Sequence, residues 1–394
     1  MNSPAPYMAQ HFITGIDVGT HQVKVVIARA EETESGAPQI IATGYAESRG
    51  LHHGYIAHPE DAARSIRNAV AQAEKASGLK VKRAHISIGG IGLDEIQARG
   101  ESITSRADST ITQIDVDKAI EASETSIQDK IPNRKIIHAI PLHFFVDGEK
   151  VHGRPHGLKG TKLEADVLFI TVFEQHLTDL MAAIEGIGIK VEDVMAAPLA
   201  ASLVMLTKAQ KRAGCILANI GAETVSILVF ENSTPISLKV FGLGSADVTN
   251  DIALGLKIPL EEAEKIKRGG MTAVPYSKRK LDEIISARLS DIFEIINEHL
   301  KKMKRDGLLP AGIILTGGGA AISNIQELAK TQLRLPAKIA TLDMAQNGKV
   351  KDASWAVGYG LCVWGISDSE DESGVSVVRN TSNTLLNWLK QFLP

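Results

Sequence analysis

Two stretches of this sequence follow one pattern, and that repeat limits the fold more than any other feature. Residues 15–27 read GIDVGTHQVKVVI, and residues 217–229 read LANIGAETVSILV. In both, an apolar run leads into a turn of small residues and a β-branched run leads out, which is typical of a β-hairpin. We therefore predict two similar lobes, each built on such a hairpin and on helices, around a central cleft.

Between and beyond these hairpins, the sequence predicts helices and separate segments. Helical spacing marks residues 59–77, 116–129, 198–209, 246–256, 260–268 and 279–305. The predicted segments are a flexible N-terminus (1–11), a first lobe (12–83 and 166–210), an inserted subdomain rich in short strands (84–165), a second lobe (211–364), a disordered linker (365–382) and an amphipathic helix (383–394).

Glycine-rich turns indicate a phosphate site. Each hairpin turn can aim backbone N–H groups at an anion, and glycine lets the backbone approach phosphate oxygens closely. A third turn, TGGG from Thr316 to Gly319, leads from a predicted strand towards a helix, whose N-terminus attracts negative charge. One such turn alone is typical of an ordinary hairpin, whereas the three together favour a nucleotide in the cleft.

The C-terminal segment SNTLLNWLKQFLP has the spacing of an amphipathic helix. Its apolar face consists of Leu385, Leu386, Trp388, Leu389, Phe392 and Leu393. Such a helix can dock on its own protein or lie in a membrane interface. We expect membrane binding, because polar residues 366–382 separate the helix from the lobes and its aromatic side chains suit the interface.

Composition excludes several classes of function. The net charge of −3 argues against a nucleic-acid partner, which would need a basic surface. Two cysteines are too few for a disulfide framework or a zinc site and favour a reducing cytoplasm. The N-terminus lacks the features of a signal peptide, and no apolar run reaches the ~18–20 residues of a membrane span. We expect a cytoplasmic protein with only peripheral membrane contact.

The motifs GIDVGT, NIGAETVSI and TGGGA occur in the order of the phosphate-1, phosphate-2 and adenosine motifs of the actin/Hsp70/sugar-kinase superfamily, which this chain resembles. Longer stretches, among them SRGLHHGYI, HGLKGTKLEADVLFIT and DVTNDIALGLKIPLEEAEKIK, are similar to the FtsA family of bacterial cell-division proteins. The resemblance implies an α/β, actin-like two-lobed ATPase fold with duplicated sheet-and-helix cores. It also implies an inserted subdomain of the FtsA type and a C-terminal amphipathic helix.

The resemblance further implies a site for ATP and Mg²⁺, with Asp17 as the candidate Mg²⁺ ligand. The implied residues of the two phosphate loops are Asp17, Gly19, Thr20, Lys24, Asn219, Gly221, Ala222, Glu223 and Thr224, together with Gly244. Those implied near the sugar, the α-phosphate and adenine are Gly317, Gly318, Gly319, Glu264, Lys267 and Arg268. For the last three, a solvated helix face is the alternative interpretation.

In function, the resemblance implies a tether. Members of the family form head-to-tail filaments and anchor the C-terminal tail of FtsZ to lipids of the cytoplasmic membrane. They act on its inner face at the division site, where later divisome proteins join. We expect the insert, residues 84–165, to make the head-to-tail contact.

Three departures from the superfamily pattern bear on these expectations. Asn219 replaces the usual aspartate and cannot supply its charge to Mg²⁺ or to the attacking water, so we expect slow ATP hydrolysis or none. Glu223 is expected to bring a carboxylate close to the phosphates, and Ala197 replaces an acidic residue. The link from Gly269 to Lys278 is shorter than in FtsA relatives, which bears on the FtsZ site.

Two other functions stay open. A PilM-like adaptor of a pilus or secretion system would share the fold and the insert but is not expected to carry the terminal helix. A phosphotransferase of the sugar-kinase type would need a base aimed at its substrate, and no candidate stands out. The motif SIGGIG (Ser87 to Gly92) is interpreted as a bend, and the histidines at 138, 143, 152 and 156 lack the tight spacing of a metal site.

Overall fold

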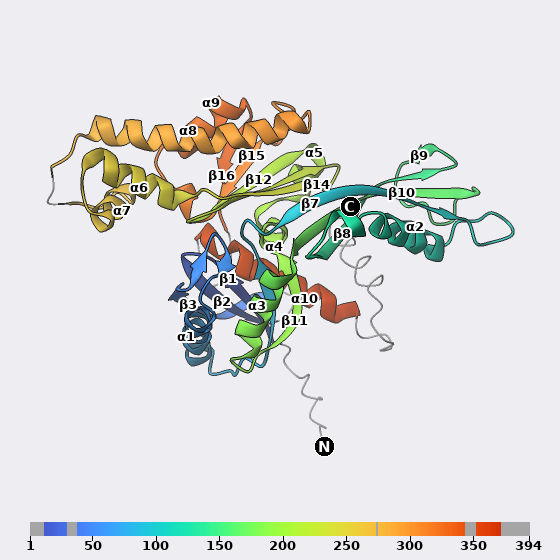
Figure 1. The fold of residues 1–394 in the computed structure, drawn as a ribbon, viewed down its shortest axis with the longest axis horizontal. Helices are drawn as coiled ribbons and strands as arrows, with labels where there is room; N and C mark the ends of the chain where they lie inside the picture. The colour runs from blue at the N-terminus through green and yellow to red at the C-terminus, as the bar shows by residue number, and fades with distance from the viewer. Residues whose placement is uncertain (1–11, 30–37, 273–274, 343–351, 372–394) are drawn as a thin grey trace, which may run out of the picture.

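A computed structural model describes residues 12–29, 38–272, 275–342 and 352–371, which form two lobes and an inserted subdomain (Figure 1). The predicted N-terminal segment (1–11) and amphipathic helix (383–394) lie outside the described residues, as does most of the predicted linker. None of the helices in the described ranges combines the length and apolar character needed to cross a membrane.

The first lobe is built on a five-stranded sheet with β1 at its centre. β1 runs antiparallel to β2, which pairs with β3, and on its other side lie the parallel strands β6 and β11. In spatial order the strands are β11 (Lys190–Ala196), β6 (Arg83–Ile88), β1 (Phe12–Val18), β2 (Gln22–Arg29) and β3 (Gln39–Glu47). The predicted first hairpin is therefore confirmed.

Helices cover this sheet and a small hairpin lies at its edge. α1 (Pro59–Ser77) contacts β2 and β3, and it has proline and two acidic residues in its first turn, as its predicted start requires. The remaining elements of this lobe are β4 (Leu51–His52), β5 (Tyr55–Ile56), α3 (Glu174–Glu185) and α4 (Ala197–Met205). The short helix α5 (Lys208–Ala213) instead packs on β13 of the second lobe.

The second lobe repeats the arrangement of the first. β12 is antiparallel to β13, which pairs with β14, and on its other side lie the parallel strands β15 and β16. The strands are β14 (Thr234–Phe241), β13 (Val225–Glu231), β12 (Cys215–Ile220), β15 (Ile313–Thr316) and β16 (Ala337–Ile339). The helices are α6 (Ser245–Leu256), α7 (Leu260–Lys267), α8 (Lys278–Lys302) and α9 (Ile325–Leu333).

The insert forms its own antiparallel sheet, β7-β10-β8-β9, and its own small core. Its elements are β7 (Asp94–Ile103), α2 (Gln113–Thr125), the short helix η1 (Gln128–Lys130), β8 (Arg134–Val146), β9 (Glu149–Val151) and β10 (Lys162–Phe173). α2 packs on β7 and β10, and its capping box at Thr112 starts the helix three residues before the predicted boundary.

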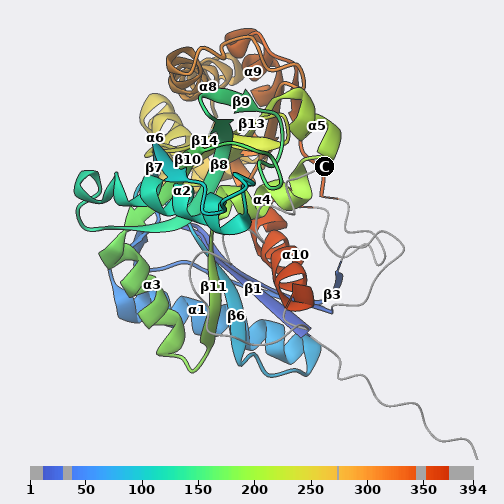
Figure 2. The same ribbon diagram turned by 90° about the vertical axis from the view of Figure 1, so that its right-hand side faces the viewer.

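A last helix, α10 (Ala356–Asp371), follows the short helix η3 (Ala353–Trp355) and returns the chain from the second lobe to the first. It contacts α4 on one side and β1, β2 and β6 on the other (Figure 2). The largest buried cluster accordingly combines side chains of both sheets, such as Ile16 and Leu217. The two lobes therefore share part of one core.

Three predicted helix boundaries were wrong. The helix predicted at 198–209 is two helices, because Leu206 is extended and Thr207 opens α5 with a capping box to Gln210. α10 continues to Asp371, so the start of the predicted linker at 365 is helical; helix propagation from the buried first turns extends it. The glycine turn after β15 enters a 3₁₀ helix, η2 (Gly318–Ala321), and α9 begins only at Ile325.

Candidate functional site

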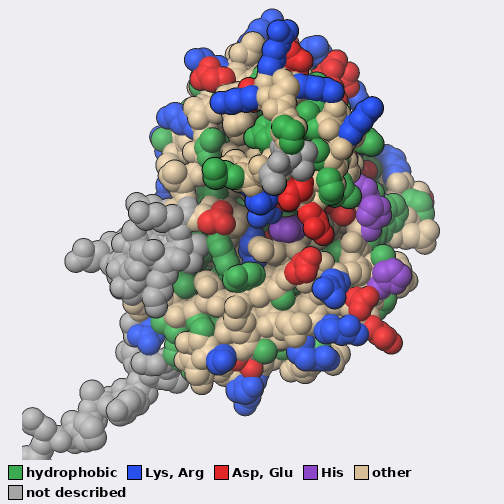
Figure 3. All heavy atoms as spheres, turned by 90° about the vertical axis from the view of Figure 1, so that its left-hand side faces the viewer, with side chains coloured by type: hydrophobic (Ala, Val, Ile, Leu, Met, Phe, Trp, Pro, Cys, Tyr) green, Lys and Arg blue, Asp and Glu red, His purple; other side chains and the backbone are tan. Residues whose placement is uncertain are grey.

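A cavity of about 1290 Å³ lies between the two lobes. Its walls come from the turns after β1, β12 and β15, from α6 and α7, and from the segment before α10. On the face shown in Figure 3, acidic, basic and histidine side chains gather at mid-height. Every predicted nucleotide-site residue lines the cavity except Glu223 and Gly244.

The first phosphate loop is a tight turn with a half-buried carboxylate at its entrance. The Gly19 N–H donates to the Gln22 carbonyl (3.2 Å) and closes the turn. Asp17 is the second-last residue of β1, and its Oδ1 accepts a hydrogen bond from Ser87 Oγ at 2.8 Å. Burial raises the pKa of Asp17, and the nearby Lys24 charge opposes the rise. A carboxylate that is partly removed from water in this way is stabilised when a cation approaches it.

Lys24 connects the first loop with the start of α10. Its Nζ donates to the Ser354 carbonyl at 2.8 Å and lies 5.7 Å from the centre of the Trp355 ring. Burial lowers the pKa of Lys24, while the charges of Asp17 and Asp352 raise it. The ammonium group therefore sits at the floor of the cavity among acidic and carbonyl groups.

The second phosphate loop has the same closure as the first. The Gly221 N–H donates to the Thr224 carbonyl (2.8 Å), and the Ser245 N–H donates to the Gly221 carbonyl (2.9 Å). Gly244 does not line the cavity but supports the loop, because a Cβ at 244 would lie 2.4 Å from the Ala222 carbonyl oxygen. The loop thus rests closely on the N-terminus of α6.

The expectation that the Glu223 carboxylate lies close to the phosphates is not met. The side chain leaves the cavity and reaches the β4–β5 hairpin of the first lobe, where Oε2 accepts the His53 N–H at 2.5 Å. Ala222 and Thr224 line the cavity, whereas Glu223, between them in the turn, does not.

The three glycines of the third turn, residues 317–319, have different neighbours. Gly317 has a positive φ of 84°, and a Cβ there would lie 2.2 Å from Asn219 Oδ1. A Cβ at Gly319 would lie 2.4 Å from Ile220 Cγ2, whereas a Cβ at Gly318 would meet no protein atom within 4 Å. Gly317 and Gly319 therefore allow close packing on β12, and Gly318 leaves space in the cavity.

Glu264, Lys267 and Arg268 form one network on α7 rather than a solvated face. Glu264 contacts Lys267 and Arg268 at 2.6 Å each and accepts a hydrogen bond from Thr249 Oγ1 at 2.6 Å. Lys267 Nζ also donates to the Ser245 carbonyl at 2.9 Å, and its side chain is only 7% exposed. Burial would raise the pKa of Glu264, but hydrogen bonds from Lys267 and Thr249 lower it to about 2.

Several cavity residues were missed in the sequence. Ser87, Gly89 and Gly90 belong to the motif interpreted as a bend, yet they line the cavity. β6 is parallel to β1, so the carboxyl ends of both strands meet at one edge, and this signal could have identified Ser87 beside Asp17.

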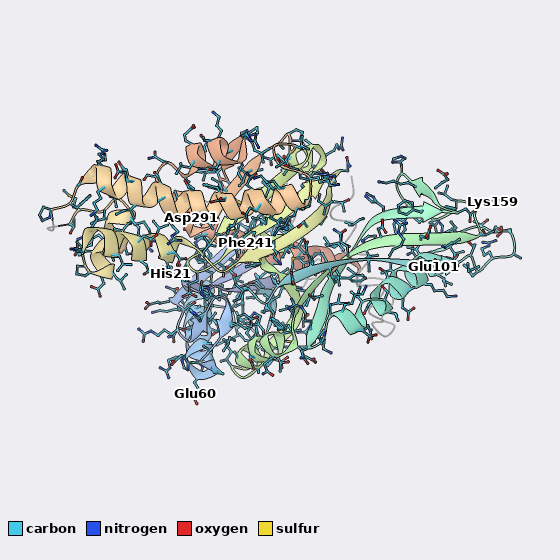
Figure 4. All side chains as sticks on the ribbon, turned by 45° about the horizontal axis from the view of Figure 1, so that its top comes forward. His21, Glu60, Glu101, Lys159, Phe241 and Asp291 are labelled. Atoms are coloured by element: carbon cyan, nitrogen blue, oxygen red, sulfur yellow. The ribbon has the colours of Figure 1, made fainter. Side chains whose placement is uncertain are left out.

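His21 was also missed and lies at the boundary between the lobes (Figure 4). Its Nε2 is 3.5 Å from an Nη of Arg268, across the cleft. Burial, and then the charge of Arg268, lower the pKa of His21. The two side chains therefore meet where the first loop faces α7.

The residues present fit a nucleotide with a metal ion. Two closed glycine turns face one cavity, a third turn leaves space at Gly318, and the half-buried carboxylate of Asp17 stands at the entrance of the first loop. Backbone N–H groups in such turns suit phosphate oxygens, and carboxylates suit Mg²⁺. The described residues contain no cluster of three or more His, Cys, Asp or Glu that could hold a metal without a ligand's help.

Comparison with known proteins gives related sequences and folds. The family described as "Cell division protein FtsA" matches residues 216–360, and the domain described as "SHS2 domain inserted in FTSA" matches residues 95–171. "Cell division protein FtsA" of Bacillus subtilis is 30% identical over 368 residues, which cover 88% of this chain and 81% of that protein.

Two solved structures resemble the fold. A chain of the "PilM-PilN type IV pilus biogenesis complex" has a TM-score of 0.70 at 16% identity and covers 91% of this chain and 99% of its own. "MreB5 of Spiroplasma citri bound to ADP" has a TM-score of 0.54 at 13% identity, with 93% and 99% covered. The predicted actin-like α/β fold with an inserted subdomain is confirmed.

Proposed function

Because the chain belongs to the FtsA family of cell-division proteins, we propose that it is an ATP-binding tether for FtsZ. It binds ATP with Mg²⁺ in the cleft, assembles head to tail, and anchors FtsZ polymers to the inner face of the cytoplasmic membrane. Later divisome proteins then join the assembly. One observation supports the proposed binding of a nucleotide: the two closed phosphate loops and the α7 network line the same cavity.

The proposal gives a role to each group of residues that lines the cleft. The turns at Gly19 and Gly221 offer N–H groups to phosphate oxygens from opposite lobes. Asp17 is the residue that would hold Mg²⁺, whose charge would offset that of the phosphates. The carboxylate and ammonium groups of Glu264 and Lys267 suit ribose hydroxyls and ring nitrogens. The MreB5 structure, which has a related fold and is bound to ADP, supports a nucleotide here.

We expect slow ATP hydrolysis because of the residues that line the cavity near the two phosphate loops. Asn219 lines the cavity where the superfamily has an aspartate, and Glu223 turns away from it. Ala197, at the start of α4, also lines the cavity without a carboxylate. Few groups are therefore placed to orient an attacking water.

The test measures ATP binding and phosphate release on the same protein. We expect Mg²⁺-dependent binding of ATP and turnover well below ~1 s⁻¹, the lower end for kinases. The absence of ATP binding would contradict the nucleotide site, and turnover at or above ~1 s⁻¹ would favour a phosphotransferase. The likeness to the PilM chain, at 16% identity, shows the fold alone and does not favour the adaptor function.

A further inference from the structure

We propose that Glu223 is a positioning residue whose side chain latches the second phosphate loop to the first lobe and thereby slows nucleotide exchange. This inference rests on the nucleotide site proposed above. It begins from a departure in sequence, a glutamate in a loop of small residues, and from the side chain's direction away from the cavity.

Three contacts join Glu223 to the β4–β5 hairpin. Its Oε2 accepts the His53 N–H at 2.5 Å and lies 3.5 Å from His52 Nδ1. Its main-chain carbonyl oxygen lies 3.0 Å from His53 Nδ1. The side chain of Glu223 is 29% exposed, so water competes only in part for these partners.

The hairpin transmits this contact to the wall of the cavity. The Ile91 N–H donates to the His53 carbonyl at 3.1 Å. Gly54 and Gly90 meet so closely that a Cβ on Gly54 would lie 2.3 Å from Gly90 Cα. Gly54 and Gly90 both line the cavity, near Ser87 and its partner Asp17. The latch therefore ends on the same first-lobe segment that supports the first phosphate loop.

On the other side, Glu223 belongs to the second phosphate loop itself. Its neighbours Ala222 and Thr224 line the cavity, and the loop is closed by the bond from Gly221 to Thr224. When the lobes separate on this side of the cleft, the contacts to the hairpin must break. A nucleotide held between the two loops leaves only when they separate, so the latch adds to the barrier for release.

The first experiment measures release of a fluorescent ATP analogue from wild type, Glu223→Ala and Glu223→Gln after mixing with excess ATP. A charge-assisted hydrogen bond predicts release about ten-fold faster for Glu223→Ala. Glu223→Gln keeps an acceptor for the His53 N–H and should recover part of the slow release. Glu283→Ala removes a glutamate of α8 that is 61% exposed and serves as the matched control, with unchanged release.

Release from Glu223→Ala at the wild-type rate would overturn the latch, and release from Glu223→Gln as fast as from Glu223→Ala would overturn the hydrogen bond as its basis. A second measurement needs no nucleotide. Hydrogen exchange of the His53 and Ile91 amides should be faster in nucleotide-free Glu223→Ala than in wild type and Glu283→Ala. If wild type bound no analogue, the proposed nucleotide-binding function would fail, but the hydrogen-exchange data would still test the latch. Unchanged protection of the His53 amide in Glu223→Ala would refute the latch.

Discussion

The Asp17 side chain is placed to bind a cation, but its position lowers the stability of the folded chain. Its carboxylate is half-buried near the end of β1 with Ser87 as a hydrogen-bond partner, and burial raises its pKa. A raised pKa means that the ionised form is less favourable, relative to the neutral form, in the folded chain than in water. Such a group is retained where a cation is to be bound.

We predict that Asp17→Asn separates these two effects. The amide has the shape of the carboxyl and can still accept the Ser87 hydrogen bond, so the midpoint of thermal unfolding without nucleotide should not fall. Mg²⁺-dependent ATP affinity, measured by calorimetry, should fall by about ten-fold or more. Retained Mg²⁺-dependent affinity in Asp17→Asn would remove this residue from the metal site.

The glycine turn supplies a second prediction. Gly318→Asp should leave the fold intact, because a Cβ there meets no protein atom within 4 Å, and should abolish ATP binding by placing bulk and negative charge in the cavity. Gly319→Asp should instead lower the thermal midpoint, because its Cβ would lie 2.4 Å from Ile220 Cγ2. Calorimetry and thermal unfolding of both variants, with Gly318→Ala as the smaller control, check the assignment. Unchanged affinity in Gly318→Asp would contradict it.

His138 makes stability depend on pH. It is buried on β8, its Nε2 accepts the Ala196 N–H at 3.0 Å, and burial lowers its pKa from 6.5 to about 3. Between these values the unfolded chain takes up a proton that the folded chain does not, so stability is lost as the pH falls below 6.5.

We predict a loss of up to about 1.4 kcal/mol of unfolding free energy per pH unit from this residue. Denaturant unfolding of His138→Gln should show a shallower decline between pH 6.5 and 4 than wild type. The exposed His156, replaced by Gln, is the control and should follow wild type. Equal slopes for His138→Gln and wild type would contradict the prediction.

At the scale of elements, local patterns predicted most of the fold. The hairpins and α1 follow from alternation, small turns and a proline with acidic residues at the helix start. The division between α4 and α5 was also readable, since Thr207 and Gln210 have capping-box spacing. The extension of α10 was not, because it depends on the buried turns that precede an acidic, polar run.

The sequence motifs predicted which segments form the site, but not how their side chains pair. Glycine turns identify the loops, but they do not say which way the Glu223 side chain points, because its partner His53 is 170 residues away in the other lobe. The same holds for His21 and Arg268, which meet only when the lobes are assembled. Contacts between lobes depend on tertiary packing, which periodicity does not encode.

At the scale of the whole molecule, the insert contacts both lobes. It interrupts the first lobe in the chain, yet Glu95 of β7 accepts the Leu238 N–H of β14 at 2.6 Å, and Asp94 pairs with Lys239 at 2.8 Å. A surface held by both lobes suits the proposed head-to-tail contact, which leaves two ends open and builds a filament. We expect that many copies of the predicted membrane helix along such a filament would bind firmly by avidity.

The most direct test of the tether is co-sedimentation of FtsZ polymers with liposomes in the presence of this chain and ATP. We predict that wild type carries FtsZ into the liposome pellet. Trp388→Glu, which puts a charge on the apolar face of the expected helix at 383–393, should leave both proteins in the supernatant while ATP binding is unchanged. FtsZ that stays in the supernatant with wild type, or that reaches the pellet equally well with Trp388→Glu, would contradict the account.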